Sequence, residues 1–312
     1  MSDPVVEISG LTKYFGDKHA VNQVSMTVNQ GEVYGLLGRN GAGKTTVMKM
    51  LLGLLPPTRG QSTLFGCSSQ ELTPDILARV GYLAEGHYLY GWMRIQELAR
   101  FTKSTHPLWS DERYNAFMGY FDLDPKQHIK SLSNGQRAQV SLATALACQP
   151  ELLIMDDPTL GVDAATRQDF LRGIVDLVSQ ENRTVLFSSH ILADVERIAD
   201  RIGIIDKGVL RVDIGLNEFK NRVARYHLEF PGDVPKDLMV PRQVSCTVMG
   251  SELSITVANP GPDVDLALAK LNATRCERLE LSLEEAFVDY TSSNRKLRLS
   301  FADLSKESES TL

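Results

Sequence analysis

A glycine-rich stretch near the N-terminus has the residue types and the spacing of a phosphate-binding loop. Gly38, Gly43, Lys44 and Thr45 fit the pattern G-x-x-x-x-G-K-[ST], and the apolar run 33–37 precedes them. An apolar strand that turns through glycines into a helix aims backbone N–H groups and the positive helix end at an anion. The lysine adds a mobile positive charge, and the threonine adds a hydroxyl for Mg²⁺. The strand and helix patterns around the motif argue against the alternative, a flexible turn without a ligand. The residues predicted to hold phosphate are Gly38, Asn40, Gly41, Ala42, Gly43, Lys44, Thr45 and Thr46.

Two polar residues follow other buried-strand patterns and could complete a nucleotide site. Asp156 ends the apolar run 152–155, and His190 follows the run 185–189. Because the carboxyl ends of parallel strands meet at one edge of a sheet, both side chains should emerge beside the phosphate loop. Asp156 could then reach Mg²⁺ next to Thr45, and His190 could sense the γ-phosphate. The alternatives are an aspartate that only caps a strand and an ordinary surface histidine.

Composition limits the classes of partner. The 312 residues contain 33 Lys and Arg against 39 Asp and Glu, and the net charge of -6 gives no general attraction to nucleic acid or anionic membranes. The cysteines are scattered without a CxxC pair, which disfavours a zinc site and a disulfide framework and fits a reducing cytosol. The start of the sequence lacks the apolar core of a signal peptide, and every apolar run is too short to cross a bilayer. We therefore expect any membrane role to need a separate subunit.

The order of predicted elements indicates an α/β fold. Strands alternate with helices through most of the first 218 residues, which is typical of a P-loop sheet with helices on both faces, here joined to an antiparallel β subdomain. Between about residues 90 and 148 the pattern is helical throughout and predicts a helical insertion. Strand patterns return in 219–301 and predict a small α+β accessory domain, and the polar segment 302–312 is predicted to be a disordered tail.

Taken in order, the motifs resemble those of the ATP-binding subunit of ABC transporters over about residues 5–220. Phe15, or alternatively Tyr14, matches the aromatic residue on which adenine stacks. The other matches are the LSGGQ signature at 132–136, the Walker B strand at 152–156, the D-loop at 159–163 and the switch histidine at His190. Farther along, 282–291 resembles the SLEE-x-F ending of the ATPases that serve ABC-2-type exporters.

The resemblance implies an ATPase that works as a head-to-tail homodimer. Each of two Mg²⁺-ATP molecules would lie between the phosphate loop of one chain and Ser133, Gly135 and Gln136 of the other, with Asp163 of the D-loop nearby. Small residues at a helix start let N–H groups and a hydroxyl approach the γ-phosphate, which suits that role. The implied partner is an integral membrane permease, so the chain is expected to be cytoplasmic and peripheral on the inner face of the cell membrane. The resemblance of 282–291 to exporter ATPases implies that the direction of transport is export. No nucleic-acid partner is expected.

The chain departs from the family pattern at three positions. Asp157 stands where a glutamate usually orients the attacking water, so hydrolysis is either slowed by the shorter side chain or rescued by a shift of loop 158–160. Asn134 replaces the first signature glycine, and asparagine tolerates left-handed backbone angles well enough for the nucleotide to be clamped. Glu85 replaces the Q-loop glutamine and could bind Mg²⁺ and contact the attacking water. Asp157, His190 and Glu85 are therefore the predicted catalytic residues.

Two other functions and one local question stay open. The chain could be a nucleotide-gated scaffold with very slow hydrolysis, the alternative that Asp157 favours. It could instead be a soluble ABC protein acting on ribosomes or DNA, although one ATPase core and no heptad run disfavour this. The aromatic cluster at 88–93 either packs against the helical insertion or receives a helix from a membrane subunit.

Overall fold

A computed structural model describes residues 4–181, 183–235 and 238–292, and it divides the chain into two compact units, Met1–Leu216 and Asn217–Leu312. The boundary lies two residues before the predicted end of the first domain at 218. The predicted tail, 302–312, lies outside the described residues. Among the helices that are described, none has the length and apolar character needed to cross a membrane.

A six-stranded sheet forms the centre of the first unit, with the order β10-β9-β3-β8-β7-β6. Neighbouring strands are parallel except for β9 and β10, which form an antiparallel hairpin at one edge. The central strands are buried along their whole length, in line with the mainly apolar sequences of β3 and β7 and the apolar middle of β8. The strands are β3 (Val33–Leu37), β6 (Val80–Leu83), β7 (Leu152–Met155), β8 (Thr184–Ser189), β9 (Arg201–Asp206) and β10 (Val209–Gly215).

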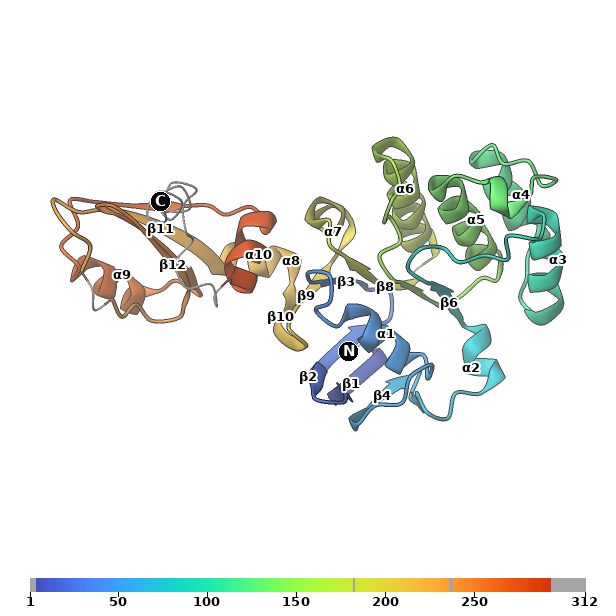
Figure 1. The fold of residues 1–312 in the computed structure, drawn as a ribbon, viewed down its shortest axis with the longest axis horizontal. Helices are drawn as coiled ribbons and strands as arrows, with labels where there is room; N and C mark the ends of the chain where they lie inside the picture. The colour runs from blue at the N-terminus through green and yellow to red at the C-terminus, as the bar shows by residue number, and fades with distance from the viewer. Residues whose placement is uncertain (1–3, 182, 236–237, 293–312) are drawn as a thin grey trace, which may run out of the picture. The chain divides into compact units, whose positions relative to one another are not determined.

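An antiparallel sheet with the order β2-β1-β4-β5 packs on the same core. Helix α1 (Lys44–Leu51) lies between the two sheets in Figure 1, and its residues Val47, Met48 and Leu51 are fully buried there. Burying one helix between two sheets fixes the end of α1 that follows the phosphate loop. The strands are β1 (Pro4–Phe15), β2 (Lys18–Asn29), β4 (Arg59–Leu64) and β5 (Cys67–Ser68).

The predicted helical insertion is present and has a small core of its own. Buried side chains from successive helices, among them Ile95, Tyr114, Met118 and Val140, pack together there. The helices are α3 (Ile95–Thr105), α4 (Asp111–Tyr120), the 3-10 turn η1 (Ile129–Ser131) and α5 (Asn134–Ala147). The remaining helices of the first unit are α2 (Pro74–Ala78), α6 (Ala164–Glu181) and α7 (Leu192–Ile198).

The second unit is a four-stranded antiparallel sheet with the order β12-β13-β11-β14 and helices packed on it. Val264 and Leu268 of α9 join its apolar core, and Arg225 of β11 bonds to Glu285 and Asp289 of α10. The α/β fold class with a small α+β domain is therefore confirmed. The elements are α8 (Leu216–Arg222), which begins at the unit boundary, β11 (Val223–Glu229), β12 (Gln243–Met249), β13 (Glu252–Ala258), α9 (Pro262–Ala269), β14 (Arg275–Leu279) and α10 (Leu283–Ser292).

Candidate nucleotide site

The phosphate loop connects β3 to α1, and other backbone segments press against its inner side. A Cβ atom on Gly43 would lie 2.6 Å from the carbonyl oxygen of Ala20, and one on Gly38 would lie 2.7 Å from that of Ile205. Gly43 also has a φ of +112°, a conformation that favours glycine. Only glycine therefore fits at these two positions. On the outer side, Asn40 and Gly41 are exposed, which leaves the backbone there open to a ligand.

Lys44 is buried at the start of α1 and already has polar partners. Its Nζ donates to the Gly38 carbonyl at 2.8 Å and lies 3.3 Å from Oδ2 of Asp157. Thr45 and Thr46 follow in the first helical turn, which contains no acidic residue. The positive end of α1 and the lysine charge therefore meet at the place where the loop is open.

Asp157 joins three parts of the site. Its Oδ1 accepts a hydrogen bond from the backbone N–H of His190 at 3.2 Å and lies 2.8 Å from His190 Nδ1. Its Oδ2 faces Lys44, and its backbone N–H donates to Ser188 Oγ at 2.9 Å. A carboxylate only accepts hydrogen bonds, so Nδ1 of His190 is the donor in this contact. The ends of β7 and β8 and the phosphate loop are thus tied together by one side chain that is 6% exposed.

Asp156 is fully buried, and only one of its carboxylate oxygens has a partner. Oδ1 accepts a hydrogen bond from Ser188 Oγ at 2.8 Å, whereas no described residue bonds to Oδ2. A buried carboxylate oxygen without a partner costs free energy unless a ligand satisfies it. An unsatisfied carboxylate oxygen has the chemistry that Mg²⁺ prefers. The described residues contain no group of three or more His, Cys, Asp or Glu that could hold a metal ion by themselves, so phosphate oxygens would have to supply ligands too.

Glu85 lies on the exposed loop that leaves β6, next to the strand that carries Asp156. The backbone N–H of Asp156 donates to the carbonyl of Leu83 at 2.8 Å. Burial, together with the charges of Asp156 and Glu85, raises the pKa of Tyr82 to about 12. In the part of the chain that the structure describes, the Glu85 carboxylate forms no hydrogen bond or ion pair, in contrast to Asp157.

The signature residues lie at the start of α5 and bond within their own helix. Ser133 Oγ accepts from the N–H of Gln136 at 3.2 Å, and the Gln136 side chain accepts from the N–H of Ser133 at 3.0 Å, which forms a capping box. Ser133 and Asn134 are exposed. Across 133–136, no hydrogen bond or ion pair among the described residues reaches the phosphate loop. The structure does not bring the two predicted parts of the site together within one chain.

Gly135 and Asp163 are brought together instead. A Cβ atom on Gly135 would lie 3.2 Å from Cγ2 of Thr166 and 3.6 Å from a carboxylate oxygen of Asp163. Asp163 accepts from the Thr166 N–H at 3.0 Å and from its hydroxyl at 2.7 Å. The start of α5 therefore packs against the start of α6, and a glycine at position 135 allows this approach.

The predicted adenine platform lies at the end of β1. The ring of Phe15 is 50% exposed, with the Nζ of Lys13 at 5.4 Å from its centroid. The alternative residue, Tyr14, packs its ring against His19 with the centroids 4.3 Å apart. The geometry therefore favours Phe15 over Tyr14 as the ring that is free to stack on a base.

The aromatic cluster after β6 is divided between the two predicted roles. Met93 is buried and Leu89 is partly buried, and both pack against the core of the helical insertion. The rings of Tyr88, Tyr90 and Trp92 are 90%, 51% and 71% exposed. The packing interpretation is correct for the first two residues and in part for Tyr90, whose ring meets that of Phe101 in α3 with the centroids 6.1 Å apart. We call the three exposed residues, Tyr88, Tyr90 and Trp92, the aromatic patch.

Sequence reasoning missed two residues that contact the site. Ser188 bonds to both Asp156 and Asp157, and a hydroxyl near the end of an otherwise apolar strand is a signal that could have found it. His87 is buried in the loop after β6, and its Nε2 lies 2.8 Å from the carbonyl oxygen of Pro158. Burial lowers its pKa. The sequence around His87 contains no pattern that predicts this contact.

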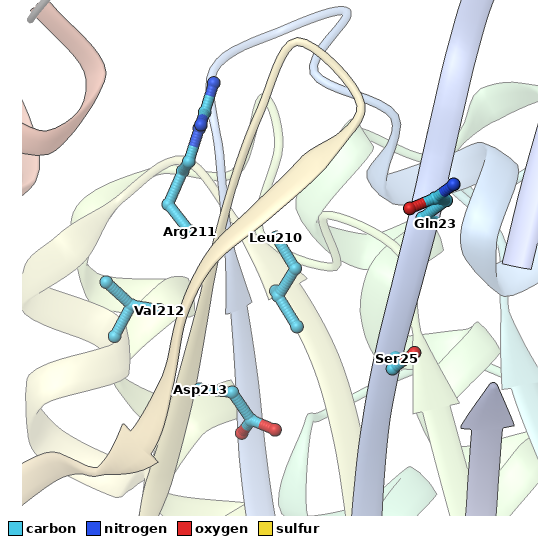
Figure 2. A pocket seen from close by; sticks show the side chains of 6 residues that line it. All are labelled: Gln23, Ser25, Leu210, Arg211, Val212 and Asp213. Carbon is cyan, nitrogen blue, oxygen red and sulfur yellow. The ribbon is translucent and has the colours of Figure 1, made fainter. Parts of the chain in front are cut away.

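A separate groove of about 320 Å³ lies between β2 and β10 (Figure 2). Leu210 points towards Gln23 and Ser25 of β2, whereas Arg211 points away from that strand. Asp213 is held at the groove by Arg201 at 2.7 Å and by the Tyr34 hydroxyl at 3.1 Å. None of the residues predicted to contact nucleotide lines this groove.

Comparison with known proteins agrees with the motifs. The family model described as ABC transporter matches residues 21–160. The ABC transporter ATP-binding protein YdbJ of Bacillus subtilis is 30% identical over 306 residues, which cover 95% of this chain and 98% of the relative. The bacitracin transport ATP-binding protein BcrA of Bacillus licheniformis is 35% identical over 228 residues, which cover 72% of this chain and 74% of the relative.

Two solved structures are similar in fold. An ATP-binding subunit of an ABC transporter superposes with a TM-score of 0.64 at 26% identity and covers 70% of this chain and 92% of its own. A dimeric cassette, MJ0796 bound to ADP and Pi, superposes with a TM-score of 0.61 and covers 68% of this chain and 98% of its own. At 21% identity, this second likeness is evidence for the fold alone.

Proposed function

The chain belongs to the ATP-binding proteins of ABC transporters, and from this premise we propose that two copies clamp two Mg²⁺-ATP molecules head to tail and drive a separate membrane permease in export. Membership of the family makes the chain an ATP-binding protein and an ATPase. The head-to-tail dimer, the Mg²⁺ ion, the permease and the direction of transport are our proposal.

The observation that carries the dimer is the difference between the two ends of the site. The phosphate loop, Asp157 and His190 are bonded to one another, whereas Ser133 is exposed and, among the residues that the structure describes, bonds only within its own helix. Ser133 Oγ accepts one hydrogen bond, so its O–H remains available to donate to a phosphate. A second copy of the chain offers a phosphate loop for the exposed Ser133 to face. In a closed two-fold dimer this pair of surfaces meets twice, which gives two equivalent sites.

Within each site the chain's own groups can divide the work. Lys44 and the backbone N–H groups of 40–46 hold phosphates, and Thr45 with Asp156 Oδ2 would hold Mg²⁺, with Glu85 in reach of the same edge. The ion supplies positive charge against the β and γ phosphates. Asp157 orients the attacking water, and His190 holds the Asp157 carboxylate and senses the γ-phosphate.

The position of Asp157 supports hydrolysis over the scaffold alternative. Its φ of +44° lies in the left-handed region. Ser188 Oγ accepts its backbone N–H, and Lys44 and His190 contact its carboxylate, so both parts of the residue are held in place. Such a fixed turn can compensate for a carboxylate that is one methylene shorter than the usual glutamate. Preorganised groups of this kind account for much of an enzyme's rate acceleration.

Dimerisation tests the central part of the proposal. Asp157→Asn should slow hydrolysis and let ATP accumulate in the site, so light scattering should detect dimers with Mg²⁺ and ATP and monomers with Mg²⁺ and ADP. Wild-type chain should release phosphate at least about tenfold faster than Asp157→Asn. Monomers at saturating ATP would refute the clamp, and equal phosphate release by the two chains would favour the scaffold instead.

The aromatic patch is the proposed docking site for a permease helix. Exposed aromatic side chains next to the loop that carries Glu85 suit an amphipathic helix, and aromatic residues are enriched at interfaces. The name of the BcrA relative, a bacitracin transport protein, supports an export role.

Exchanging Tyr90 and Trp92 for serine should abolish co-purification of a co-expressed permease. Tyr120→Ser, an exposed aromatic residue of α4, is the matched control; permease binding by both variants would exclude the patch.

A further inference from the structure

His87 is buried between the two loops that leave β6 and β7. The residue is only 4% exposed, and its Nε2 lies 2.8 Å from the carbonyl oxygen of Pro158. A carbonyl accepts but does not donate, so Nε2 carries the proton of this hydrogen bond. Its other ring nitrogen, Nδ1, is buried without a partner among the described residues.

A buried histidine at this position is less favourable in free energy than an apolar side chain of similar size would be. A buried ring nitrogen without a hydrogen bond is unfavourable, and an apolar side chain would fill the same space without that cost. His87 also has a φ of +47°, which few residues other than glycine adopt. The hydrogen bond to Pro158 is the feature of this histidine that an apolar residue could not replace.

The carbonyl that His87 holds belongs to the turn that carries Asp157. The N–H of Leu160 donates to the Asp157 carbonyl at 3.1 Å, and the Thr159 hydroxyl donates to Asp194 at 3.1 Å. Pro158 lies between these two contacts and has no N–H of its own to donate. Its carbonyl is therefore the group through which the loop after β6 can fix the middle of the turn.

We infer that His87 is a positioning residue: its Nε2–H holds the Pro158 carbonyl and so sets the place of the Asp157 carboxylate from the loop that carries the aromatic patch. This inference rests on the proposed role of Asp157. Tyr88 follows His87 directly and is exposed, so a movement imposed on the outer side of this loop is transmitted by His87 to the catalytic turn.

Two substitutions separate the hydrogen bond from the backbone conformation. His87→Asn tolerates a positive φ, but its amide ends near the position of Nδ1 and falls short of Pro158. His87→Gln extends its amide towards the position of Nε2. We expect His87→Asn to lower kcat about tenfold while Mg²⁺-ATP affinity stays within about twofold, and His87→Gln to regain most of the rate. A kcat within twofold of wild type for His87→Asn, or a parallel loss of affinity, would overturn the inference.

Hydrogen exchange tests the coupling without relying on turnover. Binding of a non-hydrolysable ATP analogue with Mg²⁺ should change exchange at the amides of residues 88–92, beyond Glu85, in wild type and His87→Gln, and this change should disappear in His87→Asn. A peptide that covers β9 serves as the control and should behave alike in all three chains. If wild type is no faster than Asp157→Asn, the proposed hydrolysis fails, and the exchange result still decides whether His87 links the two loops. A response of residues 88–92 that survives in His87→Asn would refute the link.

Discussion

The phosphate-loop end of the site and the signature end differ in how completely one chain satisfies them. At the first end, Lys44, Asp157 and His190 are joined by contacts of 2.8 to 3.3 Å and are mostly shielded from solvent. At the second end, Ser133 and Asn134 are exposed and are held only by the capping of α5. The difference indicates that one chain by itself holds the residues of its phosphate-loop end in place, whereas its signature end is left exposed to another molecule.

The largest expected effect breaks the phosphate-loop end. Lys44→Met removes the one charge that contacts both the loop and Asp157, and it leaves a buried carboxylate without its cation. We expect phosphate release to fall by about 10³-fold, with ATP affinity reduced as well. Lys49→Met, on the exposed side of the same helix, is the control and should act like wild type. Retention of a tenth of the activity in Lys44→Met would contradict this role.

A change at the signature end should act on assembly rather than on affinity. Ser133→Arg places a bulky charge on the exposed tip of α5, so we expect about 100-fold slower hydrolysis and no ATP-dependent dimer. ATP affinity of the single chain should stay within about threefold, since Ser133 does not bond to its own phosphate loop. Ser131→Arg, exposed two residues earlier, is the control.

Mixing the two variants sharpens the comparison. A mixed dimer of Lys44→Met and Ser133→Arg contains one site in which both ends are intact, whereas dimers of either variant contain none. Partial recovery of phosphate release on mixing is expected. An inactive mixture would count against a site shared by two chains.

A smaller effect is expected when the Ser188 hydroxyl, which bonds to both Asp156 and Asp157, is removed. Ser188→Ala removes the hydrogen bond to Asp156 Oδ1 and the acceptor of the Asp157 N–H. We expect the Mg²⁺ concentration for half-maximal nucleotide binding to rise about tenfold, because outer ligands orient the groups that bind a metal. Nucleotide binding in the absence of Mg²⁺ should be unchanged. Ser189→Ala, whose hydroxyl contacts Ile191, is the control, and an unchanged Mg²⁺ titration in Ser188→Ala would argue against Asp156 as a metal ligand.

The smallest effect concerns the departure from the signature pattern. Asn134 is exposed, and its Nδ2 would lie 3.3 Å from a Cβ atom on Gly161. Asn134→Gly should change the ATP dependence of dimerisation, followed by light scattering, by less than about threefold, because Asn134 begins α5 without a positive φ, so its backbone does not require glycine. A tenfold tighter dimer would show that the asparagine weakens the clamp.

The elements of the site that could be predicted are local or lie at strand ends. The phosphate loop follows from the spacing of Gly38, Gly43 and Lys44. The parallel pairing of β7 with β8 explains why the strand ends that carry Asp156 and His190 lie at one edge of the sheet. The exposure of Tyr88 and Trp92 could not be predicted, because an aromatic run reads equally well as core or as surface. Periodicity over so few loop residues does not distinguish the two.

The sequence by itself determined the family and the α/β order of elements, and it predicts which residues would contact phosphate, because short-range patterns encode glycine turns, buried strands and helix starts. Only the tertiary structure decided that Asp157 links Lys44 to His190, that Ser188 bonds to both aspartates and that His87 reaches Pro158. These partners are far apart in the chain, and a hydrogen bond forms only when packing brings donor and acceptor to about 3 Å with the right orientation. The spacing of residues in the sequence does not predict such long-range hydrogen bonds.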